Sequence, residues 1–224
     1  NLFFYFVVGL CSFAIFSLIF QTDIFKVKSI EVNGNQWLPK EELFKIANVA
    51  LDSNIIALRS WEIEKKLEEI PQVKDAKVRK VFPYLLEIEI TERQPEALIE
   101  VGSRVFCVDE EGVEIPVLST DLVRVRLPKN QRSLLLESLS LIKMWKEEFA
   151  LPLSTIVVEN DKLFILQFQN GIFIKCEGVN NLRKKTAVLK PYLRDIAVKS
   201  LEVGGFDLRA GDGLVIIPSG EDTF

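Results

Sequence analysis

The stretch SWEIEKKLEEIPQVKDAKVRKVFPYLLEIEITER, residues 60–93, decides the fold of the first half of the chain. After Ser60, apolar residues recur at the i, i+4 and i+7 spacing of one helix face. A serine in this position is a good N-cap, and a proline ends helices, so the pattern predicts a helix capped by Ser60 and stopped by Pro71.

The rest of this stretch predicts two strands. In residues 76–79 apolar side chains alternate with basic ones, and in residues 86–90 they alternate with glutamates. A Phe-Pro-Tyr turn at residues 82–84 separates the two runs. Antiparallel pairing would place Lys77 and Arg79 opposite the outward glutamates, which is a favourable cross-strand arrangement.

The residues before this stretch add one strand and one helix. Ile30 and Val32 alternate with polar residues and run into a turn at residues 33–35. A second helix is predicted from Pro39, with apolar residues at helical spacing as far as Ala50. The order is β-α-α-β-β, which indicates one α+β domain over residues 22–93.

An apolar segment precedes this domain. No charged residue occurs from Leu2 to Phe20, and nineteen residues at about 1.5 Å each span about 28 Å, close to the hydrocarbon thickness of a bilayer. A cleaved signal peptide would need a small-x-small site, which residues 21–25 do not offer. We therefore expect residues 1–21 to form an uncleaved transmembrane helix.

Residues 94–218 predict a second domain, mainly antiparallel β with two helices, followed by a C-terminal tail at 219–224. Asn170-Gly171 between alternating runs is a strong hairpin signal. A helix of about four turns is predicted over residues 135–149. Asn181 is the expected N-cap of a final helix that a later proline, Pro191, should kink or shorten. Short apolar runs predict further strands at residues 105–108, 113–117, 201–206 and 214–217.

The last of these strands is short, apolar and terminal, which favours a sheet edge with unpaired backbone groups. Cys107 and Cys176 stand at strand positions among apolar neighbours, so we expect buried free thiols, although a disulfide stays possible if the fold brings the two together. The basic run at residues 183–185 is expected to be a solvated helix face.

Catalysis is disfavoured by composition. The chain has no histidine, which removes the commonest general base and most zinc sites. Asp109, Glu110 and Glu111 could in principle form a carboxylate pair, but adjacent acids before a glycine are typical of a turn. With a net charge of −4 and no nucleotide-binding or calcium-loop motif, we expect no enzyme activity, cofactor, metal, nucleic-acid partner or small-molecule substrate.

Three motifs of the first domain resemble the POTRA domain of the bacterial cell-division family FtsQ/DivIB. They are Phe25-x-Val27-x-x-Ile30-x-Val32-x-Gly34-Asn35, Leu67-x-x-Ile70-Pro71-x-Val73-x-x-Ala76-x-Val78-x-Lys80, and Pro83-x-x-Leu86-x-Ile88-x-Ile90-x-Glu92-Arg93-x-Pro95-x-Ala97. Val108-Asp109-Glu110-Glu111-Gly112 and Phe206-Asp207-Leu208-Arg209 are similar to two motifs of the same family's second domain. Gln72 and Ala210 depart from the tryptophan and the aromatic residue common at these two places.

This resemblance implies a single-pass protein of the cell inner membrane, with a cytoplasmic N-terminus and periplasmic domains, that recruits and links divisome proteins at the septum. It implies an FtsB/FtsL-type heterodimer as partner, added as a strand to the C-terminal edge. The implied partner-binding residues are Lys162, Arg183, Lys184, Tyr192, Arg194, Phe206, Asp207, Leu208, Arg209, Ala210, Leu214, Val215, Ile216 and Ile217. In the POTRA domain, the implied recruitment residues are Ile30, Val32, Gly34 and Asn35.

Three alternatives stay open. Asp207 and Arg209 lie two residues apart on one strand face, so they form either a local ion pair or a partner contact. A POTRA-bearing export or outer-membrane assembly component would need repeated POTRA modules. An extracytoplasmic carboxylate-dependent hydrolase would need a cleft with convergent acids.

Overall fold

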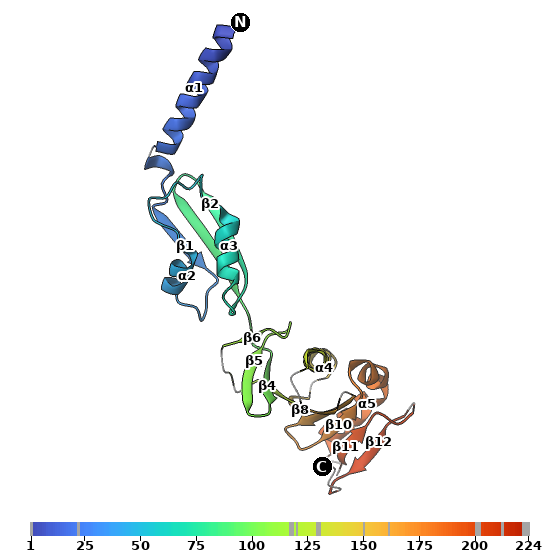
Figure 1. Ribbon diagram of the computed structural model, residues 1–224. Coiled ribbons are helices and arrows are strands. Elements are labelled where there is room, and N and C mark those ends of the chain that lie inside the picture. Colours follow the sequence, from blue (N-terminus) through green and yellow to red (C-terminus); the bar gives the residue numbers. More distant parts are fainter. Residues whose placement is uncertain are drawn as a thin grey trace. The chain divides into compact units, whose positions relative to one another are not determined.

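The structure is a computed structural model that describes residues 2–21, 23–116, 119, 121–128, 131–149, 151–160, 162–199, 203–211 and 213–220, without the side chains of residues 2, 15–21 and 195–199. It divides into two compact units, Asn1–Arg93 and Gln94–Phe224 (Figure 1). Parts of the predicted strands, namely Val117, Leu201 and Glu202, and most of the predicted tail at 219–224 lie outside the described residues.

The first unit begins with helix α1 (Leu2–Gln21) and the 3-10 turn η1 (Asp23–Phe25). Over the part of the chain that the structure describes, no helix has both the length and the apolar character needed to cross a bilayer. The predicted transmembrane helix at residues 1–21 is therefore not confirmed.

A three-stranded sheet and two helices follow in the predicted order β-α-α-β-β, which is confirmed. The elements are β1 (Ser29–Asn33), α2 (Lys40–Ala47), α3 (Ser60–Glu68), β2 (Val73–Val81) and β3 (Leu85–Glu92). The sheet order is β1-β3-β2, with β1 parallel and β2 antiparallel to β3. Lys77 lies opposite Glu89 and Arg79 opposite Glu87, as expected, and Arg79 Nη2 is 3.4 Å from Glu89 Oε2.

The predicted helix limits need two corrections. Ser60 is not an N-cap but the first residue of α3, and the N-cap position belongs to Arg59, which makes no side-chain cap. An ion pair of 2.8 Å from Arg59 Nη1 to Glu62 Oε1 spans this first turn instead. Helix α2 stops before Ala50 because Asn48 adopts a left-handed backbone with φ 49°.

A buried carboxylate, that of Glu92, fixes the segment between β1 and α2. It accepts backbone N–H hydrogen bonds from Gln36 at 3.0 Å, Trp37 at 2.9 Å and Leu38 at 2.9 Å. Three backbone N–H donors therefore converge on this buried carboxyl group. The Glu-Arg motif at the end of β3 therefore has a structural role in this domain.

The second unit is a nine-stranded sheet in the order β12-β11-β10-β9-β8-β7-β4-β5-β6, counting the described strands. These strands are β4 (Ala97–Val101), β5 (Arg104–Val108), β6 (Glu114–Ile115), β7 (Val123–Leu127), β8 (Leu153–Asn160), β9 (Leu163–Phe168), β10 (Phe173–Cys176), β11 (Val203–Asp207) and β12 (Val215–Pro218). The pairs β4–β7, β7–β8 and β10–β11 are parallel, and the other neighbours are antiparallel. The α+β class is confirmed, and the sheet is mixed with an antiparallel majority.

Two helices, α4 (Arg132–Glu148) and α5 (Val179–Lys199), lie side by side over this sheet (Figure 1). The core between them and the sheet includes Trp145, Phe164 and Phe206, all buried. Burial of such large side chains is the main source of stability for this unit.

The start of α5 differs from the prediction. The helix begins at Val179, and Asn181 lies inside it, so Asn181 is not the N-cap. The carboxylate of Glu137 on α4 accepts the Val179 N–H at 2.7 Å and thus satisfies a free donor of the first turn. Pro191 lies within α5, which continues to Lys199 and is not shortened.

Cys107 and Cys176 are free thiols, buried in β5 and β10. Burial raises the pKa of the Cys176 thiol to about 12, because the thiolate would lose its hydration. Both cysteines thus lie in the core as buried free thiols, as the sequence predicts.

Candidate partner-binding site

Strand β12 is one edge of the nine-stranded sheet, as the sequence predicts. It pairs antiparallel with β11, with Ile216 opposite Phe206 and Val215 opposite Asp207. Val215 is 49% exposed and Ile216 is 45% exposed. We call β12 the C-terminal edge, because among the described strands it has a neighbour on one side only, and it carries exposed apolar side chains.

The connection between β11 and β12 is held by α5. The buried Lys185 ammonium donates to the carbonyl oxygens of Gly213 at 2.6 Å, Ala210 at 3.3 Å and Gly211. Asn181 Nδ2 donates to the Leu208 carbonyl at 3.1 Å. Two polar side chains of one helix therefore fix the loop that leads into the C-terminal edge.

The burial of Lys185 corrects the prediction of a fully solvated basic face at residues 183–185. Arg183 and Lys184 are exposed, but Lys185 lies three residues after Leu182 and four before Leu189, both buried. These spacings place Lys185 on the apolar stripe of α5. The spacing of Lys185 from Leu182 and Leu189 is the sequence signal that indicates its burial.

Asp207 and Arg209 form the local ion pair. Arg209 Nε donates to Asp207 Oδ1 at 2.9 Å, Arg209 Nη2 donates to Oδ2, and the Arg209 backbone N–H also reaches Oδ1 at 2.9 Å. The hydrogen bond from the Arg209 side chain holds the pKa of Asp207 below its ordinary value, and the same contact raises the pKa of Arg209. The pair stiffens the end of β11 next to the C-terminal edge.

The other predicted partner-binding residues divide by exposure. Phe206 and Leu208 are fully buried, so they support the edge from inside, and Phe206 packs against Tyr192 with ring centroids 6.1 Å apart. Leu214 and Ile217 are half-buried. The exposed residues are Lys162, Arg183, Lys184, Tyr192, Arg194, Arg209, Ala210, Val215 and Ile216.

Lys162 belongs to a different part of the sheet. It lies in the turn between β8 and β9, where its backbone N–H donates to Asn160 Oδ1 at 3.0 Å. No hydrogen bond or ion pair described for Lys162 joins it to α5 or β12. The site is therefore built from α5, the β11–β12 connection and β12.

The four predicted POTRA recruitment residues have local roles. Val32 is buried in the core and Ile30 is half-buried. Gly34 has φ +85°, and a Cβ there would lie 2.1 Å from the Ile90 carbonyl oxygen. Asn35 Nδ2 donates to the Leu38 carbonyl at 2.8 Å. Together they shape the end of β1 and the turn after it.

The acids at residues 109–111 form a turn. Asp109 Oδ1 accepts the backbone N–H groups of Glu111 at 3.0 Å and Val113 at 2.8 Å, and Gly112 supplies φ +73°. An aspartate side chain that accepts hydrogen bonds from the backbone N–H groups of residues i+2 and i+4 is typical of an Asx-type turn. This confirms the turn interpretation of these acids.

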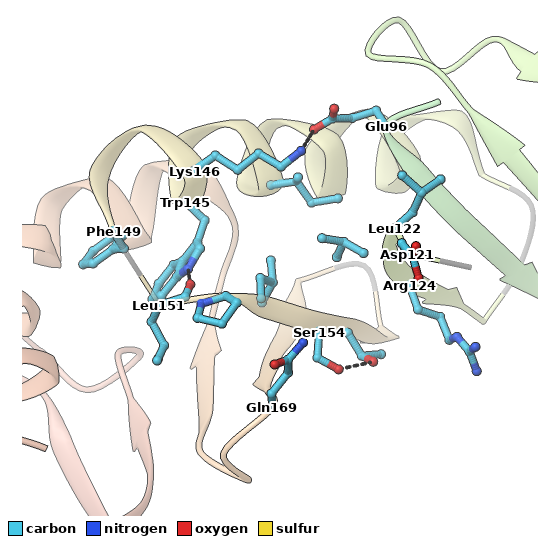
Figure 2. Close-up of a pocket in the computed structure, with 15 residues that line it drawn as sticks. Glu96, Asp121, Leu122, Arg124, Trp145, Lys146, Phe149, Leu151, Ser154 and Gln169 are labelled. Atoms are coloured by element: carbon cyan, nitrogen blue, oxygen red, sulfur yellow. Dashed lines mark hydrogen bonds and ion pairs between the residues drawn. The ribbon is translucent and has the colours of Figure 1, made fainter. Parts of the chain in front are cut away.

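A cavity of about 770 Å³ opens under the end of α4. Figure 2 shows Glu96 directed towards Lys146 and away from Asp121, and the Glu96–Lys146 ion pair measures 2.7 Å. Trp145 Nε1 donates to the Leu151 carbonyl at 2.7 Å in the same wall. Glu96 and Asp121 are thus not arranged as the facing carboxylates of a glycosidase. Among the described residues, no cluster of three or more potential metal ligands occurs.

Comparison with known proteins gives matches to cell-division proteins. The family model "POTRA domain, FtsQ-type" matches residues 25–93. A cell division protein FtsQ from Koribacter versatilis is 36% identical over 95 residues, which are 42% of this chain and 27% of the relative. The FtsQ of Syntrophotalea carbinolica is 30% identical over 112 residues, 46% of this chain and 40% of the relative.

A longer match extends through the second unit. The FtsQ of Bradyrhizobium diazoefficiens is 24% identical over 195 residues, 86% of this chain and 56% of the relative. The chain thus spans 27% to 56% of the length of these curated relatives. Together with the FtsQ-type POTRA domain at residues 25–93, these similarities support the resemblance to the FtsQ/DivIB family of cell-division proteins that the motifs predict.

Proposed function

We propose that the chain is a non-enzymatic divisome scaffold that links other cell-division proteins at the septum through its two folded units. The FtsQ relatives support a role in cell division, and the C-terminal edge carries the more specific proposal. A partner segment adds to β12 as a further strand, backbone hydrogen bonds provide the affinity, and neighbouring side chains select the partner.

The single observation that supports strand addition is the combination of a free edge with exposed Val215 and Ile216 on a stiffened base. Lys185 and the Asp207–Arg209 pair hold that base in place. Pre-organisation of this kind lowers the ordering cost that binding has to meet.

The proposed partner is an FtsB/FtsL-type heterodimer. Arg183, Lys184 and Arg194 are exposed cations on α5, the helix that holds the β11–β12 connection, and they suit a partner with acidic side chains. Exposed charges of this type increase association rate and specificity more than affinity.

We further propose that residues 1–21 anchor the protein in the cell inner membrane, with the N-terminus cytoplasmic and the folded units, residues 22–93 and 94–218, extracytoplasmic. The support is the uncharged run from Leu2 to Phe20, which α1 contains. Two partners held in one bilayer meet at a raised effective concentration, so modest intrinsic affinity is sufficient. By this proposal the POTRA domain contributes to recruitment at the septum.

The test is binding of the extracytoplasmic segments of FtsB/FtsL-type proteins from the same organism to the full chain and its variants. We expect Val215→Asp and Ile216→Asp each to weaken binding at least tenfold, since each puts a charge on the proposed contact strand. Val105→Asp is the matched control, because Val105 is 47% exposed but lies on β5. Equal affinities for all three variants would contradict strand addition at β12.

A further inference from the structure

Exposed apolar side chains gather at the end of the first unit where the chain enters from α1. Ile24, Leu51 and Phe82 are each more than half exposed, and Tyr84 is 45% exposed. Side chains of this size seldom share one exposed region unless a partner covers it. We name these four residues the juxtahelical patch.

Backbone hydrogen bonds join the three segments that carry the patch. Lys28 N–H donates to the Tyr84 carbonyl at 3.0 Å, which fixes the Phe82–Tyr84 turn beside the start of β1. Val27 N–H donates to the Ser53 carbonyl at 2.9 Å, and Asp52 N–H returns to the Val27 carbonyl at 3.0 Å. The patch is thus one region of the fold, although its members are distant in sequence.

The patch is tied closely to α1 by chain connectivity. Ile24 follows Gln21, the last residue of α1, by three residues, which limits their separation to about 11 Å. The Lys26 N–H donates to the Asp23 carbonyl at 3.4 Å, so residues 23–26 form a turn and are not extended. A bilayer that holds α1 would therefore lie within reach of Ile24.

The chemistry of the patch fits a lipid interface. Tyr84 presents an aromatic ring with a polar end, and the Lys28 ammonium lies 5.6 Å from its centroid. Aromatic, aliphatic and lysine side chains of this kind are typical of protein segments that lie in the lipid headgroup region of a membrane. Lys26 is paired with Asp23 at 2.6 Å, and Asp52 lies in the adjoining loop, so the patch has little net charge.

We propose that the juxtahelical patch docks the POTRA domain onto the surface of the bilayer that holds α1. Apolar and aromatic contacts with the headgroup and upper acyl region provide the attraction, and anionic lipid is not required. This rests on the proposed anchoring by residues 1–21. Docking would restrict the angle at which the POTRA domain leaves the membrane.

The experiment uses the full chain in phosphatidylcholine nanodiscs and measures modification of single cysteines by a charged, membrane-impermeant maleimide. Leu51→Cys is the probe and Trp61→Cys is the control, because the native side chains are 62% and 60% exposed and Trp61 lies on α3, outside the patch. Cys11 is replaced by serine in both variants, while Cys107 and Cys176 are buried. We expect Leu51→Cys to react at least tenfold more slowly than Trp61→Cys.

Two further measurements sharpen the result. Adding Ile24→Ser and Phe82→Ser to the Leu51→Cys chain should bring its rate up to that of the control, while discs with phosphatidylglycerol should leave the tenfold ratio unchanged. Equal rates for probe and control in chains that remain with the discs would overturn docking and leave the anchor intact. Slow reaction of Leu51→Cys in anionic discs alone would also overturn the apolar mechanism. A chain that separates from the discs would contradict the anchor itself, and docking with it.

Discussion

The buried ammonium of Lys185 is surrounded by the carbonyl oxygens of Ala210, Gly211 and Gly213. Hydrogen bonds that involve a charged group contribute more than neutral ones, and carbonyls left without a donor in a buried place add a further cost. At the scale of single residues, this contact joins the α5 core to the loop before β12.

We expect Lys185→Met to lower the free energy of unfolding of the second unit by about 2–3 kcal/mol, because the carbonyl groups lose their charged donor. Lys184→Met, one residue earlier and exposed, should change it by less than about 0.5 kcal/mol. Urea unfolding of the two variants in a Trp37→Phe, Trp61→Phe background, where the fluorescence comes from Trp145 alone, gives the comparison. Similar values for both would show that Lys185 is not a structural cation.

The Asp207–Arg209 pair predicts a pH dependence. The hydrogen bond from Arg209 lowers the pKa of Asp207 in the folded state, so the folded state favours the carboxylate. Its contribution to stability is present above the ordinary value of 3.8 and is lost as the pH falls through the lowered pKa. Asp207→Asn should remove this acid-side loss from a plot of unfolding free energy against pH, and Arg209→Gln should reduce it, because the backbone N–H of residue 209 still donates to Asp207. An unchanged acid side in both variants would contradict the assignment.

At the scale of elements, turns fix how the strands begin and end. Gly34 and Gly171 have nearly the same φ, +85° and +84°, but of these two only Gly34 faces a neighbour that a Cβ would strike, the Ile90 carbonyl oxygen. The two glycines therefore separate the cost of a left-handed backbone from the cost of a steric clash.

Gly171→Ala should destabilise its hairpin by about 1 kcal/mol, the backbone cost alone. Gly34→Ala should cost about 1–3 kcal/mol more, since β1 and β3 must separate to admit the methyl group. Hydrogen exchange in β1 and β3 measures the second effect directly. Equal costs for the two substitutions would mean that the end of β1 is not closely packed against β3.

Local patterns predicted the elements better than their pairing. Alternation in residues 76–90 was sufficient for β2 and β3 because their partners are close in sequence. The parallel pairs of the second unit join strands far apart in the chain, such as β10 and β11, and no local pattern specifies them. The predicted N-caps, Ser60 and Asn181, were wrong. At the start of α3 an Arg59–Glu62 ion pair spans the first turn, and at the start of α5 the Glu137 carboxylate accepts the Val179 N–H. A capping rule based on local sequence does not consider such side chains.

Local sequence likewise predicted only one part of the candidate site, the edge strand. The short apolar run at residues 214–217 indicated the edge, and the structure places β12 there. The support under it depends on Lys185 and Asn181, whose partners lie more than 20 residues away in the chain. Such contacts depend on the tertiary fold, so the spacing of residues within a short segment does not predict them.

At the scale of the whole molecule, the two units have separate hydrophobic cores, one around Leu43, Leu67 and Ile88 and the other around Trp145, Phe164 and Phe206. We expect Gly34→Ala to destabilise the unit at residues 1–93 alone and Lys185→Met the other alone. Hydrogen exchange resolved by segment in both variants checks this. A loss of protection in both units from either substitution would show that they unfold as one.

The central claim is that the C-terminal edge receives a partner strand. The most direct measurement is hydrogen exchange of the full chain in nanodiscs, titrated with the extracytoplasmic segments of its own organism's FtsB/FtsL-type proteins. The account predicts new amide protection concentrated in β12 and α5. Protection that is absent there, or that occurs only within residues 25–93, would contradict it and would assign partner recruitment to the POTRA domain.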